Sequence, residues 1–237
     1  MQALNKNKTL SKLLDFPVFS QARPNLSIAD LPGLVQTAQN EKSELLELLI
    51  EEKPDFEAVH LPNADLLFAE EKCRLHQTVR KRVAVKEDSK IVLCNKKLSL
   101  HGLRSLIGKS ELYSRFHLDS HFTRETASKI QVQQIQKGET VFIYGSLEDL
   151  KGLLVLSKSS KNTNLVLSID LMEFMSIKIG KALLKRVEQY AKAQNIESIV
   201  TELPRANQEL LAFYKAAKFK EQENCFIFHL WIKKSKQ

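Results

Sequence analysis

The 237-residue sequence predicts an α/β (α+β) protein in which a mixed, largely antiparallel sheet is flanked by helices. Helix-type and strand-type patterns alternate in the first third of the chain. Three strand patterns then follow one another between residues 140 and 170, and an amphipathic helix pattern comes directly after them. Successive strands joined by short polar loops pair antiparallel, and such a helix covers the apolar face that they form.

Composition limits the class of protein. The hydrophobic fraction is 43%, which is enough for a core, and no apolar stretch is long enough to span a membrane. The N-terminus has no secretory pattern, so a cytoplasmic location is expected. The three cysteines, Cys73, Cys94 and Cys225, are odd in number and lack C-x-x-C spacing, which argues against disulfides and zinc. We therefore expect reduced cysteines that serve in packing.

The charge of the chain is strongly positive. Its formal net charge is +8, which suits a polyanionic partner or a lysine-rich solvated surface. Nucleic-acid binding usually combines basic stripes with aromatic side chains, and aromatic residues make up only 7% of this chain. The prediction is therefore no nucleic acid and no membrane span, with a homodimer left open.

The first third of the chain predicts a small accessory unit. Helix is expected at both ends of residues 30–53, with an interruption near Asn40 and a stop at Pro54. A strand is expected over residues 55–61, a helix over 64–75 after the Pro62-Asn63 turn, and a strand over 78–86. The polar residues that follow suggest a boundary, so the predicted domains are residues 1–87 and 88–237.

The remaining chain predicts a second, larger unit. Strands are expected over residues 91–93, 140–144, 152–157, 164–170, 197–203 and 224–232. Helices are expected over residues 99–107, 123–136, 179–194 and 208–217, and residues 113–122, YSRFHLDSHF, form an irregular segment. In the helix over 179–194 the apolar side chains fall on one face, which is therefore buried.

The order of these motifs resembles the GNAT superfamily of N-acetyltransferases. The resemblance is carried by the segment from Ile179 to Trp231, which contains a helix-start glycine, an amphipathic helix, a strand, an Asn-containing loop, a helix with a tyrosine, and a final aromatic strand. It implies the GNAT acyl-CoA N-acyltransferase fold, an enzyme that uses acetyl-CoA as co-substrate, and an amine acceptor.

Two shorter segments are similar to one branch of this superfamily. LDFPVFSQAR and YSRFHLDSHF resemble the dTDP-fucosamine (dTDP-4-amino-4,6-dideoxygalactose) acetyltransferases, whose accessory domain the N-terminal unit also resembles. This likeness implies a nucleotide-linked amino sugar as the acceptor. The residues that it assigns to the acceptor lie in the irregular segment: Tyr113, Arg115, His117 and Asp119, with His121 nearby.

The resemblance also implies a cofactor site. Backbone groups of one strand would hold the pantetheine arm and polarise the thioester, and a helix N-terminus with its partial positive charge would hold the pyrophosphate. The family loop pattern is Q/R-x-x-G-x-G/A; here Met175 and Lys178 replace the first residue and the middle glycine. The matching residues are Leu167, Ser168, Ile169, Asp170, Met175, Lys178, Ile179, Gly180, Lys181 and Asn207. Gly180 equally suits a tight turn or close helix packing, and Asn207 equally suits a helix N-cap.

Acyl transfer also needs proton donors and acceptors. The resemblance assigns Tyr214 as the acid that protonates the departing thiolate, although a tyrosine on an amphipathic helix also suits a core position. Asp170, Glu173 and His229 are candidates for the base, and a water-mediated route is equally open. His117 and His121 are four residues apart, but no third ligand is evident, so no metal is expected.

Three functions remain open from the sequence. The first is acetyl transfer to a nucleotide-linked amino sugar, and the second is transfer to the amine of a protein, peptide or small molecule. The third is a catalytically inactive binding module on the same fold, which the altered residues Met175 and Lys178 suggest.

Overall fold

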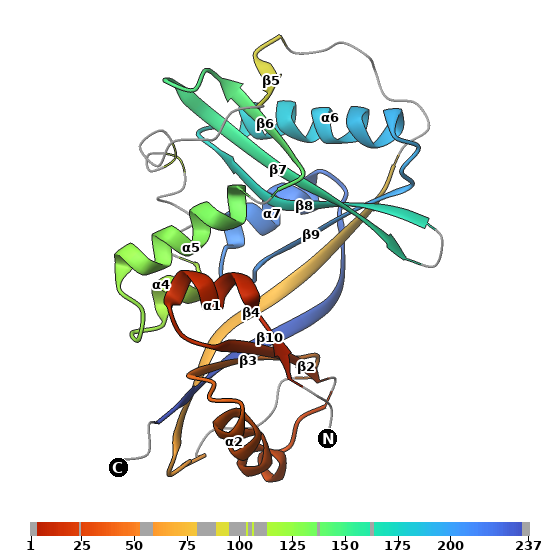
Figure 1. The fold of residues 1–237 in the computed structure, drawn as a ribbon. Helices are drawn as coiled ribbons and strands as arrows, with labels where there is room; N and C mark the ends of the chain where they lie inside the picture. The colour runs from red at the N-terminus through yellow and green to blue at the C-terminus, as the bar shows by residue number, and fades with distance from the viewer. Residues whose placement is uncertain are drawn as a thin grey trace.

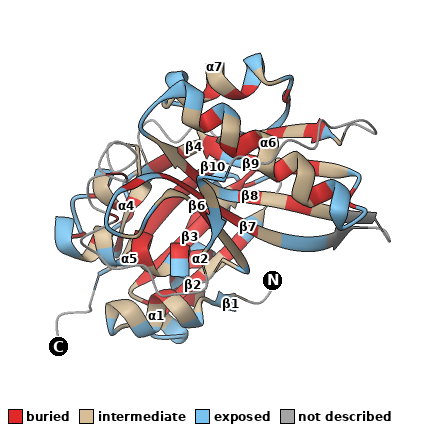
Figure 2. Ribbon diagram, turned by 90° about the horizontal axis from the view of Figure 1, so that it is seen from above, coloured by how far each residue is buried: buried red, intermediate tan, exposed pale blue. Residues whose placement is uncertain are grey.

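A computed structural model gives the fold of the chain (Figure 1). It describes residues 4–23, 25–52, 59–79, 89–94, 103, 106, 113–136, 138–161 and 164–233. One twisted sheet runs through the molecule, and helices cover both of its faces (Figures 1 and 2).

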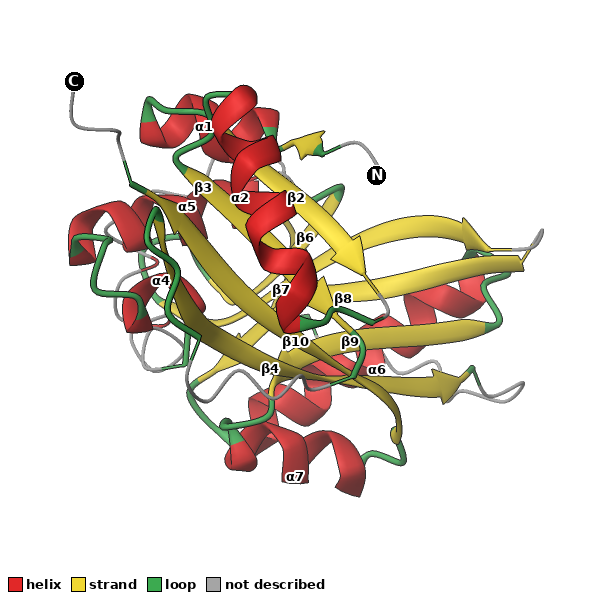
Figure 3. Ribbon diagram, turned by 90° about the horizontal axis from the view of Figure 1, so that it is seen from below, coloured by secondary structure: helices red, strands yellow, loops and turns green. Residues whose placement is uncertain are grey.

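The sheet contains ten strands among the described residues, in the order β1-β2-β3-β10-β4-β9-β8-β7-β6-β5. Most neighbours are antiparallel, whereas β2–β3 and β8–β9 are parallel. The long strands β4 and β10 lie side by side in the middle (Figure 3). The strands are β1 Asn5–Lys6, β2 Val18–Arg23, β3 Leu45–Ile50, β4 Ala64–Thr78, β5 Ile91–Leu93, β6 Thr140–Gly145, β7 Leu150–Lys161, β8 Asn164–Phe174, β9 Ser198–Pro204 and β10 Lys220–Ile232.

Alternate side chains of the strands point to different helices, so the helices form two layers. On β7, Leu153 and Val155 pack with α5, whereas Leu154 and Leu156 pack with α6 and α7. On β10, Phe228 faces α2 and Trp231 faces α1 and α5. One layer holds α1 (Lys8–Leu14), α4 (Arg115–Leu118) and α5 (Arg124–Gln136); the other holds α2 (Leu31–Asn40), α6 (Ile177–Ala193) and α7 (Gln208–Ala216).

The helices and strands predicted after residue 122 are confirmed, with shifts of up to four residues at their ends. The segment 113–122, predicted to be irregular, contains the one-turn helix α4, Arg115–Leu118. The three successive strands, the amphipathic helix α6, strand β9, helix α7 and the last strand all occur in the predicted order. Strand β5 and helices α2 and α5 are also confirmed. The predicted strand 55–61, helix 99–107 and strand 78–86 fall largely or wholly outside the described residues. All three cysteines are free thiols, as expected.

Two predicted helices in the first third are wrong. The second helix expected before Lys53 is instead strand β3, Leu45–Ile50, because a short, continuously apolar run suits a buried strand as well as a helix. The helix expected over residues 64–75 is strand β4, which is paired on both edges, with β10 and β9. This double pairing outweighs the helix preference of the Glu70-Glu71-Lys72 run.

The predicted boundary between residues 87 and 88 lies outside the described residues. Strand β4 comes before that boundary in the chain, and its sheet neighbours β9 and β10 come after it. The sheet is therefore continuous across strands from both predicted units.

Leu156 on β7 packs against α6 and α7, so we expect Leu156→Ala to lower the free energy of unfolding strongly. Leu156 is fully buried, so truncation removes apolar contacts and leaves a cavity that costs about 2–5 kcal/mol in the free energy of unfolding. Leu93→Ala on β5 is the matched control, because Leu93 is 52% exposed. Urea denaturation measures both variants, and equal losses would contradict this assignment of the core.

Candidate active site at the divergence of two strands

Strands β8 and β9 pair over only part of their lengths. Their parallel pairing runs from Val166 and Ser198 to Ile169 and Thr201. Beyond those residues β8 continues to Phe174 beside β7, and β9 continues to Pro204 beside β4. The two strands therefore form a fork in the middle of the sheet, where backbone N–H and C=O groups on the inner edges can pair with a ligand.

A β-bulge marks the point where the fork opens. On β7, Val155 is paired with Leu171 and the next residue, Leu156, with Ile169, so Asp170 is an extra residue in β8. A bulge of this kind bends its strand and increases the local twist, which turns β8 away from β9. Asp170 is exposed and accepts a hydrogen bond from the Ser157 hydroxyl at 2.9 Å.

The pairing of β8 with β9 decides which of the predicted cofactor residues on β8 can offer backbone groups to a ligand. Leu167, Ser168 and Ile169 lie in the paired part of β8, where β9 occupies the neighbouring edge. The open part of the edge begins at Asp170. Of the four predicted strand residues, Asp170 alone is placed to offer backbone groups to a ligand in the fork.

Tyr214 lies at the base of the fork. It is 1% exposed and packs between the rings of Phe213 and Phe219. The Thr201 hydroxyl donates to the Ile169 carbonyl at 2.9 Å across the two strands, and it also hydrogen-bonds with the Tyr214 phenol. Burial raises the pKa of Tyr214 well above its usual value, so the phenol is protonated at neutral pH.

The N-terminus of α6 lies just past the end of β8. Ser176 caps this helix by accepting from the Ile179 amide, and Lys178 and Lys181 are exposed in the first turns. A Cβ at Gly180 would lie 2.9 Å from Phe213 Cζ and 3.0 Å from the Phe174 ring. Gly180 thus lets α6 approach these rings closely, which is the packing role that the sequence left open.

A groove runs along the layer of α6 and α7 beside this helix start. Its volume is about 530 Å³ and its lining is mainly apolar, with Lys181 near the helix N-terminus. At one end of α7, the Asn207 side chain caps the helix by accepting from the Leu210 amide at 3.1 Å. The lining residues are Phe174, Ile177, Lys181, Glu209, Ala212, Phe213, Ala216 and Ala217.

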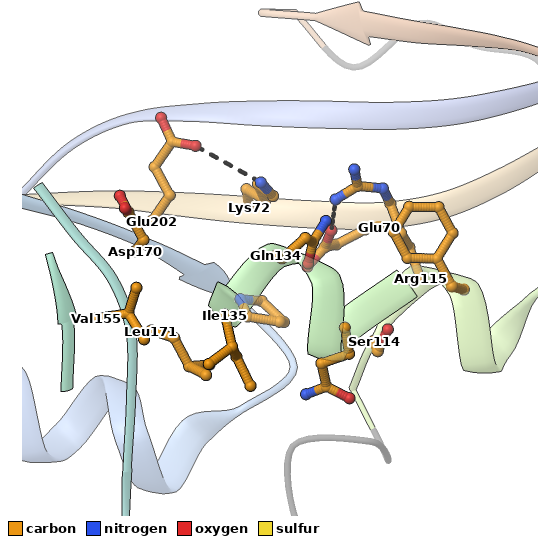
Figure 4. A pocket seen from close by; sticks show the side chains of 13 residues that line it. Glu70, Lys72, Ser114, Arg115, Gln134, Ile135, Val155, Asp170, Leu171 and Glu202 are labelled. Atoms are coloured by element: carbon orange, nitrogen blue, oxygen red, sulfur yellow. Dashed lines mark hydrogen bonds and ion pairs between the residues drawn. The ribbon is translucent and has the colours of Figure 1, made fainter. Parts of the chain in front are cut away.

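A second pocket lies on the layer of α4 and α5, at the same fork. It has a volume of about 170 Å³ and reaches Asp170 on β8 and Glu202 on β9 (Figure 4). Because Leu171 packs with α5 and Phe174 packs with α7, the groove and the pocket lie on opposite faces of the sheet. The pocket residues are Glu70, Lys72, Ser114, Arg115, Phe116, Gln131, Gln134, Ile135, Val155, Asp170, Leu171, Glu202 and Pro204.

Arg115 forms one wall of this pocket but already has two carboxylate partners. Its Nε and Nη2 lie 3.1 Å from Glu47 Oε1, and its Nη1 lies 3.4 Å from Glu70 Oε2. Burial raises the pKa of Glu47, but the charge and hydrogen bond of Arg115 and the nearby His229 ring outweigh burial and lower it to about 2. The guanidinium that the sequence assigned to the acceptor is therefore neutralised by the protein.

His229 and Asp119 extend this network into the core. His229 is fully buried, with Nδ1 2.6 Å from Asp119 Oδ2 and Nε2 3.7 Å from Glu47 Oε1. Trp231 Nε1 donates to the same Asp119 oxygen at 2.9 Å. Burial lowers the pKa of His229, but its hydrogen bond to Asp119 and the nearby negative charge of Glu47 outweigh burial and raise it. His229 is thus a buried imidazole between two carboxylates, which favour its protonated form, and it lies away from the fork.

The predicted acceptor residues do not converge on the pocket. Arg115 lines it, whereas Asp119 is buried against His229 and Trp231. His117 Nε2 lies 3.3 Å from Ser128 Oγ, and His121 stacks on Trp231, so the two histidines do not share a ligand. Tyr113 is half-buried, next to the pocket residue Ser114.

Sequence reasoning missed the acidic residues contributed by β3 and β4. Glu47 and Glu70 belong to strands that the sequence assigned to helices, and only their pairing with β10 brings them to Arg115. Among the candidate bases, Asp170 faces the pocket, Glu173 is half-buried further along β8, and His229 is enclosed.

Comparison with known proteins places this geometry in a known fold. No family model matches the chain, and no curated protein matches its sequence. The structure is similar to a protein assigned to the GNAT family of acetyltransferases from Novosphingobium aromaticivorans DSM 12444, with a TM-score of 0.54 and 12% identity over 86% of this chain and 82% of that chain. The chain has the GNAT fold.

Other solved structures with related folds differ in their reported roles. A tandem GNAT protein from the clavulanic acid biosynthesis pathway has a TM-score of 0.52 and 12% identity, over 88% of this chain and 70% of that one. Saccharomyces cerevisiae N-myristoyltransferase with bound myristoyl-CoA has a TM-score of 0.53 and 11% identity, over 93% of this chain and 61% of that one. At these identities the likeness establishes the GNAT fold and leaves the acceptor open.

Within the described ranges, no cluster of three or more His, Cys, Asp or Glu side chains has the arrangement of a metal site. Across the same part of the chain, no helix combines the length and apolar character needed to cross a membrane.

The buried network predicts a stability optimum in mildly acidic solution. Lowered pKa values of Glu47 and Asp119 give stability that is present above pH 4.5 and lost as the pH falls through their folded-state values. The raised pKa of His229 gives stability that is fully present below pH 6.5 and lost as the pH rises through its folded-state value.

Asp119→Asn tests this network directly. The substitution replaces the carboxylate beside His229 with an uncharged amide, so we expect a loss of about 3–5 kcal/mol in the free energy of unfolding at the pH values where His229 is protonated. Urea denaturation between pH 4 and pH 9 measures the effect, with exposed Asp149→Asn as the control that leaves stability unchanged. A loss below about 1 kcal/mol for Asp119→Asn would show that the pair does not stabilise the fold.

Proposed function

We propose that the protein is an acyl-CoA-dependent N-acyltransferase that acts on an amine. The observation that carries the proposal is the fork between β8 and β9, which has a pocket on one face of the sheet. On the other face, a groove lies past the fork, at the end of β8 at Phe174 and along α7. A thioester donor and an amine acceptor entering from opposite faces would meet at Asp170. Such alignment of two reactants is itself a large part of catalysis.

The residues present suit a CoA donor. The open edge of β8 can hydrogen-bond the amide groups of a pantetheine arm, as an added strand would. The apolar groove suits its alkyl segments, and the N-terminus of α6 with Lys178 and Lys181 suits a pyrophosphate. Lys178 stands where the family pattern has glycine, and because it is exposed its ammonium can reach a phosphate at the helix start.

The proposed reaction proceeds by direct transfer. The acceptor ammonium loses a proton, through water or to Asp170, and its nitrogen attacks the thioester carbonyl. Backbone N–H groups on the open edge of β8 stabilise the oxyanion. The C–S bond then breaks as the C–N bond is completed. The buried phenol of Tyr214 turns from Thr201 toward the fork and protonates the thiolate, and the second N–H proton leaves through water to restore the phenol.

The acyl group and the acceptor can be proposed more specifically. The sequence resemblance favours acetyl-CoA and a dTDP-linked amino sugar. The pocket offers little support for a diphosphate, because Arg115 is held by Glu47 and Glu70 and Lys72 lies 3.6 Å from Glu202. An acceptor without phosphate, which was the second option from the sequence, fits the pocket better.

Thiol release from acetyl-CoA tests the proposed activity. Amines of different charge are supplied as acceptors: an alkyl monoamine, an alkyl diamine, a lysyl peptide and a dTDP-amino sugar. Turnover with any of them supports an N-acyltransferase. Lack of turnover with all of them, together with no heat of CoA binding at millimolar concentration, would contradict it and leave an inactive binding module.

Tyr214→Phe separates the chemical step from binding. Removal of the phenol proton is expected to lower kcat by about 10²–10⁴-fold, because the thiolate then leaves without a positioned acid. The Kd for CoA should change little, since the ring and its packing remain. Phe219→Leu, in the same aromatic cluster, serves as the packing control, and an unchanged kcat for Tyr214→Phe would exclude the acid role.

A further inference from the structure

Thr201 is buried at the point where β8 and β9 separate. It is paired with Ile169 in the last pair of the parallel ladder, and it is 4% exposed. Its hydroxyl donates to the Ile169 carbonyl at 2.9 Å. Because the two strands diverge beyond this pair, the hydrogen bond closes the base of the fork.

Thr201 and Tyr214 lie on the same side of the sheet. Ile199 and Leu203, two positions away from Thr201 in either direction along β9, belong to the apolar core beneath α6 and α7, which also contains Tyr214. Helix α7 thus brings the phenol over β9, where it hydrogen-bonds with the Thr201 hydroxyl. Since both residues are almost fully buried, bulk water does not compete for this bond.

The single proton of the Thr201 hydroxyl fixes the direction of both hydrogen bonds. A carbonyl oxygen can only accept, so Thr201 is the donor in its bond to Ile169. The Thr201 oxygen then has only lone pairs to offer, and the phenol of Tyr214 donates to it. In this arrangement the phenol proton points at Thr201.

The packing of the Tyr214 ring limits how the phenol can move. The rings of Phe213 and Phe219 meet it edge to face, with centroids 5.7 Å and 5.0 Å from its own. A ring packed in this way keeps its place, so the O–H bond turns toward the fork by rotation about the C–O bond. The phenol oxygen stays beside Thr201 during this rotation.

Transfer of the phenol proton leaves a negative oxygen in a buried site. Burial raises the pKa of Tyr214, the Thr201 hydroxyl opposes burial and lowers it, and the charge of Glu173 raises it again. A hydrogen bond to an ionised oxygen is roughly twice as strong as one between neutral groups. The Thr201 hydroxyl is therefore more stable as a donor to a phenolate than as a donor to the Ile169 carbonyl.

We infer that Thr201 is a positioning residue for the acid Tyr214, and that its hydroxyl turns from the Ile169 carbonyl to the phenolate oxygen when the phenol proton is transferred. This inference rests on the proposed acyltransferase function and adds a residue to it. In this step the phenol O–H bond breaks and the S–H bond of the thiol forms, while Thr201 keeps its own proton. When the phenol is protonated again through water, the Thr201 hydroxyl returns to Ile169.

Thr201→Val tests the inference, because valine has nearly the same shape and lacks the hydroxyl. We expect kcat for thiol release from acetyl-CoA to fall about 10–100-fold, which corresponds to the loss of one hydrogen bond to an ionised oxygen, with little change in the KM and Kd for the cofactor. Thr201→Ser keeps the hydroxyl and should restore kcat. An unchanged kcat for Thr201→Val, or equal losses in the valine and serine variants, would overturn the inference.

Thr140→Val is the matched control. Thr140 Oγ1 lies 3.1 Å from the Tyr190 phenol oxygen, so it forms the same kind of hydroxyl pair, but it lies on β6, two strands away from β8. This substitution should leave kcat unchanged. A comparable loss of kcat in the control would mean that such pairs act through the stability of the fold, and it would overturn the role of Thr201.

The Tyr214→Phe background shows whether Thr201 acts through the phenol. Without the phenol no phenolate forms, so Thr201→Val should lower kcat no further in this background. Losses of kcat that multiply in the double variant would overturn the inference, because Thr201 would then act independently of Tyr214.

Urea denaturation of the same variants keeps this inference distinct from the proposed activity. Thr201→Val removes the partner of both the Ile169 carbonyl and the phenol in the native chain, but that of the carbonyl alone in the Tyr214→Phe background. The urea midpoint should therefore fall further in the native chain. This result supports the pairing of Thr201 with Tyr214 even if no thiol is released, and the proposed activity alone is then contradicted. Equal shifts in the two backgrounds, with thiol released by the native chain, would support the acyltransferase and overturn the role of Thr201.

Discussion

The partial pairing of β8 with β9 is the constraint on which the site depends. The extra residue at Asp170 changes the direction of β8, and the Thr201 hydroxyl holds the strands together at Ile169, immediately before they separate. Tyr214 packs at that same point, and the groove and the pocket lie on either face beyond it. The continuous sheet supports this opening, because β7 holds the outer edge of β8 and β4 holds that of β9.

The buried ionic network has a different function from the fork. Asp119, His229, Glu47 and Arg115 link α4 and its following loop to the strands β3 and β10. Each carboxylate faces a cation, which offsets the cost of burying the charges. The network fixes Arg115 at the wall of the pocket, between the buried carboxylates of Glu47 and Glu70. It thus couples the stability of the α4 and α5 layer to the charge of the pocket.

The order of elements in the C-terminal half could be predicted because each helix or strand there has a clear hydrophobic periodicity in its sequence. Helix α6 buries one face, and β6 to β8 are separated by polar turns. Strands β3 and β4 could not be predicted, since their state is decided by pairing with β10 and β9. The pocket was missed for the same reason: Glu47 and Glu70 reach Arg115 only through those pairings. The bulge at Asp170 is likewise a property of the β7–β8 register.

The central claim is that the open edge of β8 binds the pantetheine arm of CoA. Hydrogen–deuterium exchange of the backbone amides, measured with and without CoA, tests it most directly. We predict that CoA slows exchange between Asp170 and Phe174 and at the start of α6, with little change in the paired segment from Val166 to Ile169. Unchanged exchange over Asp170 to Phe174 at a CoA concentration that saturates the protein would contradict the account.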